Sequence, residues 1–283
     1  MKKLLAILLA AIMVLSFAAC GKKEVKENPV IKLATTTSVN DSKLLYYLLP
    51  VFEKETGYKV KVASEGTGIA IGFAKSGDAD LLLVHSKAQE EQFIADGFAS
   101  TERLSFMYNY FVIAGPADDP AKIAEKETAA DCFKAISEAK AAFASRGDNS
   151  GTHNKETGIW EAAAIDPAKE SWYNSVGSGM GDTLTKANEL KAYVLTDKAT
   201  FLSNKDSVPN LKILKAEAED MKNTYSLIGV NPEAKAFEGK DVKINTEGAQ
   251  ALIDWLLGEE AAKLIEEYGK AEYGEPLFFL INK

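Results

Sequence analysis

Hydrophobic and polar positions recur along most of the chain with two periods, one typical of strands and one of helices. Short apolar runs such as Ala79–His85 predict buried strands. The segment 42–57 instead has apolar residues at 44, 45, 48, 49 and 52, which is the stripe of an amphipathic helix. Pro50 lies inside this stripe and predicts a kink or a second short helix, and Gly57 predicts the helix end.

Strand-like and helix-like patterns alternate through the whole chain after residue 29. Ligands of folds built this way gather beyond the carboxyl ends of the strands, so the loops after strands are where we expect chemistry. The alternation predicts an α/β architecture with largely parallel sheets. The C-terminal stretch 247–269 predicts an amphipathic helix broken near Gly258. The segments with strand patterns are Val30–Thr35, Tyr58–Ser64, Ala79–His85, Tyr108–Gly115, Ala141–Arg146, Ala192–Thr196, Leu211–Leu214 and Tyr225–Val230.

The N-terminus has the pattern of an export signal. Basic residues at positions 2 and 3 precede the apolar run Leu4–Phe17, which is too short to span a bilayer. Small residues and then Cys20 follow, as in a bacterial lipobox, although a lipobox usually has leucine three positions before the cysteine, where this chain has Phe17. We therefore predict a lipoprotein signal peptide at 1–19, acylation of Cys20 and a polar tether at 20–29. The alternative is ordinary secretory cleavage, with Cys20 incidental.

Composition narrows the possible functions. Beyond Cys20 the chain has one cysteine, Cys132, so an internal disulfide is excluded and the fold depends on its core. The formal net charge of −8 argues against nucleic acid as a partner. The negative field of the whole protein repels anions, so any bound anion must be recognised by hydrogen-bond donors close to it. The length allows one large or two modest domains.

Two loops after predicted strands are rich in hydrogen-bond donors. The first strand runs into the hydroxyl-bearing Thr35–Ser38 and then a helix, which predicts a neutral anion site, or else a helix cap with spare polar residues. The second strand ends at the glycine-rich segment 64–72. Its glycine spacing does not fit a dinucleotide fingerprint. Thr67 is a candidate donor there, and a plain tight turn is the alternative.

The segment 145–156, "SRGDNSGTHNKE", repeats the plan of strand, glycine-bearing turn and helix. Arg146 supplies a fork of fixed donors suited to an oxyanion. Asp148 could hold that fork in place, and the next residues would present hydroxyls and amides at the helix start: Ser150, Gly151 and Thr152. A further loop, 177–184, also places glycines before a helix, as either a ligand contact or a structural turn.

Enzymatic and metal-binding interpretations have less support. Ser150, His153 and Asp148 lie within one loop, whereas the members of a catalytic triad usually come from separate loops. His85 and His153 have no zinc spacing, and the acidic residues do not cluster as calcium ligands do. We predict a protein that is not an enzyme and has no cofactor or metal site. An exported α/β protein of this size suggests a solute-binding protein for an importer.

Several motifs resemble the tungstate-binding proteins of bacterial ABC importers, in order and through essentially the whole chain after the signal. One departure is Tyr110, where that family commonly has aspartate. The motifs are "LATTTSVNDS", "DLLLVHSKAQEEQF", "SRGDNSGTHNKE", "GMGDTLTKANEL" with "YVLTD", and "GVNP".

This resemblance implies a class II periplasmic-binding-protein fold, with two α/β lobes joined by two crossover strands around a ligand cleft. The expected crossovers lie near Gly115 and Asn223, giving lobes of 30–114 plus 224–283 and of 115–223. The resemblance implies capture of a tetrahedral oxyanion, delivery to a membrane permease, and a monomer. The oxyanion-binding residues it implies are Thr36, Thr37, Ser38, Thr67, Arg146, Ser150, Gly151 and Thr152.

Three alternatives remain open from the sequence. Tungstate and molybdate are nearly isosteric, so the preference for tungstate rests on the resemblance. A phosphate-binding protein of the same fold would use Asp148 to accept the phosphate proton instead of bracing Arg146. A secreted serine hydrolase using Ser150 and His153 is the more distant alternative.

Overall fold

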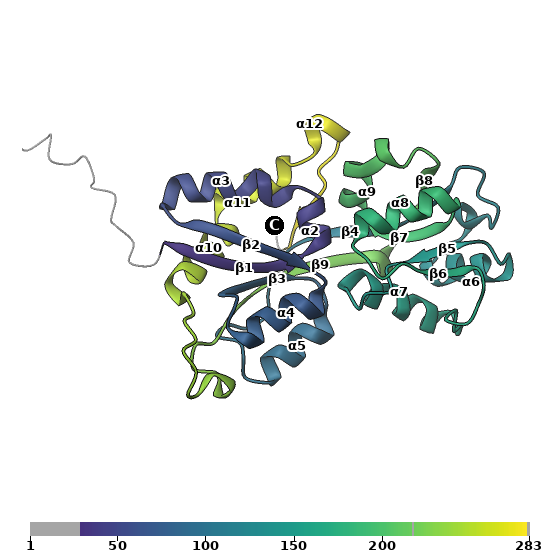
Figure 1. The fold of residues 1–283 in the computed structure, drawn as a ribbon. Coiled ribbons are helices and arrows are strands. Elements are labelled where there is room, and N and C mark those ends of the chain that lie inside the picture. Colours follow the sequence, from purple (N-terminus) through teal and green to yellow (C-terminus); the bar gives the residue numbers. More distant parts are fainter. Residues whose placement is uncertain (1–28, 217, 282–283) are drawn as a thin grey trace, which may run out of the picture.

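The computed structural model describes residues 29–216 and 218–281, arranged as two α/β lobes side by side (Figure 1). The predicted signal peptide, Cys20 and nearly all of the tether lie outside these residues. In the described part of the chain, no helix combines the length and apolarity needed to cross a membrane.

The first lobe is built on a sheet with strand order β2-β1-β3-β9-β4. The pairs β1–β2 and β1–β3 are parallel, whereas β9 is antiparallel to both of its neighbours. A short strand at the C-terminal end, β10, adds to β4. The strands are β1 (Val30–Thr36), β2 (Lys59–Glu65), β3 (Leu81–Val84), β4 (Leu104–Pro116), β9 (Lys222–Gly229) and β10 (Phe279–Leu280).

The second lobe repeats this arrangement. Its strand order is β6-β5-β7-β4, with β8 on the other side of β4. Here β5 is parallel to β6 and β7, and β4 is the antiparallel strand. In each lobe one long crossing strand therefore lies antiparallel to a group of three parallel strands, β9 beside β2-β1-β3 and β4 beside β6-β5-β7. The remaining strands are β5 (Phe143–Ser145), β6 (Tyr173–Ser175), β7 (Tyr193–Asp197) and β8 (Leu211–Lys215).

The strands β4 and β9 connect the lobes. Along β4, residues up to Tyr110 pair with β9, and residues from Phe111 onward pair with β7. Gly115, near which the sequence predicts the first crossover, lies further along β4 and pairs with β8. On β9, Asn223 lies opposite Asn109 in this connecting region. Tyr110 packs edge-on against the rings of neighbouring aromatic residues, Tyr108 and Phe279.

Helices cover both faces of each sheet (Figure 1). In the first lobe α3, α10 and α11 contribute to one core, and α4 and α5 contribute to the other. In the second lobe α6 and α7 lie opposite α8 and α9. The helices are α2 (Thr37–Asp41), α3 (Leu44–Thr56), α4 (Thr67–Ser76), α5 (Lys87–Ala95), α6 (Ala129–Glu138), α7 (Gly151–Ala162), α8 (Met180–Leu190), α9 (Lys198–Asn204), α10 (Thr246–Leu257), α11 (Glu259–Glu267) and α12 (Lys270–Tyr273), with 3-10 turns η1 (Ile123–Glu125), η2 (Lys205–Ser207), η3 (Glu219–Met221) and η4 (Lys235–Phe237).

The period of two along the strands explains these two-sided cores. In β3, Leu81 and Leu83 join the core under α3, whereas Leu82 and Val84 join the core under α4. All four side chains are buried, because a central strand has a helix layer on each face. This is why the strand reads as a continuous apolar run in the sequence.

Most predicted elements are present, and the differences have local causes. The helix α3 runs through the exposed Pro50 without ending there, so the prediction of a second short helix is wrong. The break lies earlier, at Lys43, whose φ is 62°. Gly57 ends α3 with a left-handed conformation, and Gly258 separates α10 from α11, both as predicted.

The phenylalanine at position 52 tests the packing of the first lobe. Phe52 is fully buried between the rings of Tyr58 and Trp255. We expect Phe52→Ala to lower the free energy of unfolding by about 3–5 kcal/mol, since the change leaves a cavity. Tyr46→Ala on the same helix is the control, because Tyr46 is 69% exposed. Urea denaturation measures both, and equal losses in the two variants would contradict this packing.

Candidate functional site

The loops that follow the parallel strands of both lobes meet between the lobes. A methyl group built on Gly66, after β2, would lie 3.6 Å from Cβ of Ser150, after β5. Ser38, after β1, has its hydroxyl 3.3 Å from Nε2 of His85, after β3. A methyl group on Gly151 would lie 2.7 Å from the ring of the same histidine. Segments far apart in the sequence therefore form one site, as expected for the carboxyl ends of strands.

Seven buried side-chain atoms have no hydrogen-bond partner within the described residues, and four of them belong to the loops that meet here. These four are Oγ1 of Thr37, Thr67 and Thr152, and Nε of Arg146. Thr37 and Thr67 come from the first lobe, and Arg146 and Thr152 come from the second. A buried donor without a partner costs about 1–3 kcal/mol, so native structures rarely keep one without a reason. All four groups can donate to a negatively charged oxygen.

The guanidinium of Arg146 is held in place by its own loop. Its Nη2 donates to Oδ2 of Asp148 at 2.5 Å, while Oδ1 of Asp148 accepts the backbone N–H of Ser150 at 3.1 Å. Arg146 is only 2% exposed. Asp148 thus braces the arginine, which is the first of the two roles considered from the sequence. The turn needs glycine at 147, where φ is +62° and a methyl group would lie 1.9 Å from Oγ of Ser175.

The serine and histidine of this loop stabilise the start of α7. Oγ of Ser150 accepts the backbone N–H of His153 at 3.2 Å, and Nδ1 of His153 accepts the backbone N–H of Asn149 at 2.9 Å. The imidazole nitrogen that could act as a base is therefore bonded to the backbone. The loop is a helix cap, and the first-turn amides of α7, from Gly151 and Thr152, carry the positive end of the helix dipole.

In the hydroxyl run of the first loop, the side chains of residues 36 and 38 have partners within the protein. Oγ1 of Thr36 lies 3.2 Å from Oγ of Ser38, which in turn reaches His85. Thr36 and Ser38 are almost completely buried. Thr37, between them, is the one whose hydroxyl has no partner in the described part of the chain. Across the cleft, its methyl carbon lies 3.9 Å from a methyl group built on Gly179, the N-cap of α8.

A set of buried polar residues under these loops was not predicted as part of the site. His85 bonds through Nδ1 to Asn223 at 2.8 Å, and Asn223 bonds to Asn109 at 2.9 Å. Asn109 donates to Asp197 at 3.2 Å. Burial lowers the pKa of His85 to about 4; the nearby Arg146 also lowers this pKa, and the hydrogen bond to Oδ1 of Asn223 opposes both effects. Burial likewise raises the pKa of Asp197 to about 6.

The sequence signal for these residues is weak. Asn109 is a polar residue inside the mostly apolar strand β4. Asn223 is the second residue of β9, more than a hundred residues later in the sequence. Neither belongs to a glycine-rich loop or a helix start, which are the features that point to a binding site in the sequence.

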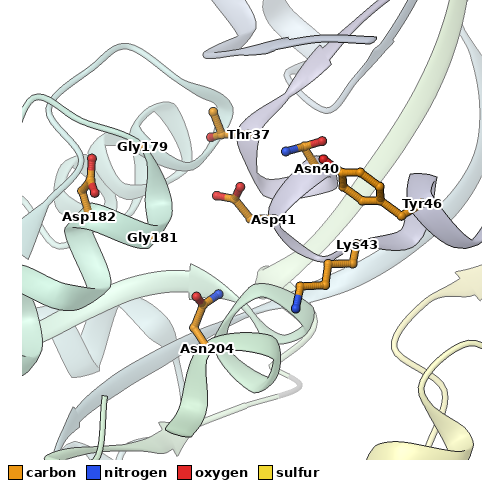
Figure 2. A pocket seen from close by; sticks show the side chains of 9 residues that line it. All are labelled: Thr37, Asn40, Asp41, Lys43, Tyr46, Gly179, Gly181, Asp182 and Asn204. Atoms are coloured by element: carbon orange, nitrogen blue, oxygen red, sulfur yellow. The ribbon is translucent and has the colours of Figure 1, made fainter. Parts of the chain in front are cut away.

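The cleft between the lobes opens beside Thr37. This cavity of about 650 Å³ is lined by α2 and α3 on one side and α8 and α9 on the other. Asp41 points into it, and Asp182 of the opposite lobe also lines it (Figure 2). Burial raises the pKa of Asp41, while Arg146 opposes that rise and Asp182 adds to it.

A second opening, of about 390 Å³, is lined by His85 and Gly151 among others. Its charged lining is basic, in contrast to the acidic pair in the first opening. The cations are Lys87, Arg103, Lys155 and Lys222. Within residues 29–216 and 218–281, no group of three or more histidine, cysteine, aspartate or glutamate side chains could hold a metal ion.

Comparisons with known proteins agree with this geometry. A family model described as "PBP superfamily domain" matches residues 24–260. The tungstate-binding protein TupA of Peptoclostridium acidaminophilum is 45% identical over 98% of both chains. The structure of the tungstate ABC transporter from Geobacter sulfurreducens is 43% identical, with a TM-score of 0.75 over 84% of this chain and 98% of that one. The tungstate-binding protein TupA from Desulfovibrio alaskensis G20 is 37% identical, with a TM-score of 0.74 over 90% of this chain and 100% of that one.

The close contact between Gly151 and His85 gives a test of the site's packing. We expect Gly151→Ala to destabilise the protein by about 1–3 kcal/mol, because the rigid imidazole ring cannot move away freely. Gly158→Ala on the same helix is the control, since its methyl group would meet nothing within 4 Å. Thermal unfolding should show a lower melting temperature for Gly151→Ala and an unchanged or higher one for Gly158→Ala. The same melting temperature in both variants would contradict the contact.

Proposed function

The chain belongs to the periplasmic-binding-protein superfamily and, within it, to the family of tungstate-binding proteins of ABC transporters; on this basis we propose that it captures tungstate outside the cytoplasm and delivers it to the permease of an importer. Members of this family bind solutes for transport and are not known as enzymes. The cap geometry of Ser150 and His153 likewise gives no support to the hydrolase alternative.

The observation that carries the proposal is the set of four unpaired donors contributed by both lobes. A fully deprotonated tetrahedral dianion accepts hydrogen bonds on every oxygen and donates none, so it matches a site made of donors. The proposed side-chain contacts are Thr37, Thr67, Thr152 and Arg146. The backbone of Gly151 and the hydroxyl of Ser150 complete the donors at the start of α7, while Thr36 and Ser38 shape the loop between β1 and α2.

The same donors suggest how other anions are rejected. Hydrogen phosphate carries a proton that needs an acceptor, and Asp148 already accepts from Arg146 and Ser150. Sulfate carries no proton and must be rejected by size, since its bonds to oxygen are shorter. The choice of tungstate over molybdate rests on the relatives, because the two anions are nearly isosteric.

The proposed route to the membrane uses segments outside the described residues. Residues 1–19 would direct export, acylated Cys20 would anchor the chain, and 20–29 would form the tether. The first strand begins at Val30, directly after this segment. The lobes would then capture the anion close to the permease without leaving the membrane surface.

Competition titration tests the ligand. We expect the purified protein to bind tungstate, with molybdate competing most strongly, and sulfate and phosphate competing weakly. Isothermal titration calorimetry with each anion, followed by displacement experiments, measures this order. Tight phosphate binding without a response to tungstate would refute the proposal and favour the phosphate alternative.

Substitutions of the donors test the site itself. Arg146→Ala should weaken tungstate binding by about 2–5 kcal/mol, because it removes a charge-assisted partner from a buried anion. Thr152→Val keeps the side-chain shape and should cost about 1.5–3 kcal/mol, the typical contribution of a hydrogen bond to a charged group. Thr185→Val on α8 is the control, since that exposed hydroxyl bonds only to the backbone of Gly181. If Arg146→Ala binds tungstate with wild-type affinity, the anion site does not include this loop, and the proposed contacts are wrong.

A further inference from the structure

Six buried polar residues form a closed hydrogen-bonded ring, through side chains and two backbone groups, beside the proposed anion site. This interlobe ring consists of Ser38, His85, Asn223, Asn109, Asp197 and Thr200. Ser38 and His85 come from the first lobe, Asp197 and Thr200 come from the second, and the two asparagines come from the crossing strands. Thr200 closes the ring by donating from Oγ1 to the backbone carbonyl of Ser38 at 3.2 Å.

The direction of hydrogen bonding in the interlobe ring is fixed at Asp197. Oδ1 of Asp197 accepts the backbone N–H of Thr200 at 2.8 Å, and a backbone amide can only donate. The side chain of Asn109 approaches the same oxygen at 3.2 Å, so it must present its NH₂ group. The carbonyl oxygen of Asn109 consequently faces Asn223, which must also present its NH₂ group, at 2.9 Å.

The orientation of Asn223 in turn fixes the protonated nitrogen of His85 and the hydrogen-bond direction at Ser38. The carbonyl oxygen of Asn223 faces Nδ1 of His85 at 2.8 Å, so that nitrogen carries a proton. With its pKa lowered to about 4, chiefly by burial, His85 is neutral near pH 7, and its Nε2 is then an acceptor. In the contact between Nε2 and the hydroxyl of Ser38, 3.3 Å away, the serine is therefore the donor. Thr36, 3.2 Å from Ser38, donates to the serine oxygen in turn.

We propose that His85 is a positioning residue for the anion site: its Nε2 accepts a hydrogen bond from the hydroxyl of Ser38, and this leaves Thr37 as the hydroxyl donor of this run. The proposal rests on the proposed function, since it concerns how the same site is arranged. The interlobe ring also fixes the relative placement of the lobes at which Thr37 and Arg146 approach one anion. Side chains at 36 and 38 act on the ligand indirectly, through the shape of the loop.

The proton positions can be measured without any substitution. Nitrogen-15 NMR of the imidazole side chains distinguishes the two neutral tautomers and the imidazolium form. The chain has two histidines, and His153→Gln assigns the signals by removing one set. We expect His85 to be neutral at pH 7, with the proton on Nδ1. A proton on Nε2, or an imidazolium at that pH, would reverse the direction of bonding and overturn the proposal.

A double-mutant cycle tests the effect on binding. Ser38→Ala and His85→Phe should each weaken tungstate binding about two- to tenfold, the range expected for one lost hydrogen bond. Because both remove the same interaction, the double variant should lose no more than the weaker-binding single variant. If the loss of affinity in the double variant instead equals the product of the two single-variant losses, Ser38 contacts the anion directly, which the proposal excludes.

The two experiments separate this proposal from the proposed function. If the unmodified protein does not respond to tungstate, the function fails, while the NMR measurement still decides the tautomer of His85. If tungstate binds and Arg146→Ala abolishes binding, the function stands whatever the cycle shows. Circular dichroism of each variant identifies any that does not fold, and for such a variant the NMR result on the unmodified protein decides.

Discussion

The buried guanidinium of Arg146 is the constraint on which the site depends. A cation removed from water must be compensated, and its Asp148 partner uses only part of its donor fork. The neighbouring unpaired hydroxyls add no negative charge, and the protein as a whole is acidic. This local geometry supports the proposed anion site inside a molecule whose overall field opposes anions. The glycine turn at 147 and the cap at 150 serve to hold this arrangement.

The loops of the site could be predicted from the sequence because their donors are close together in it. Arg146, Ser150 and Thr152 follow one strand, and Thr37 follows another. The interlobe ring could not be predicted, since Asn109 and Asn223 are 114 residues apart and meet only where two strands cross. For the same reason the sequence suggested Ser38 as a side-chain donor but gave no sign that its hydroxyl lies 3.3 Å from His85, which arrives from a different strand.

The fold was predictable where the apolar pattern was continuous. Buried strands such as β3 read clearly, whereas β6 and β10 are short and partly exposed and were missed. Sheets were expected to be largely parallel, but they are mixed: β2-β1-β3 and β6-β5-β7 pair in parallel, and every described pair that involves β4 or β9 is antiparallel. The antiparallel pairing arises where β4 and β9 cross between lobes, a feature of connectivity that no local pattern carries.

The repeated strand order has a consequence for how tightly a small ion can be held. Each lobe supplies only two of the four donors proposed to contact the anion, so neither lobe alone provides the full set. The crossing strands tether the second pair close to the first, which makes its engagement an intramolecular step at high effective concentration. Affinity then depends on the spacing that β4 and β9 impose as much as on the donors. A change in those strands, far from any contact with the ion, would alter binding in the same way as a change in linker length alters a bivalent ligand.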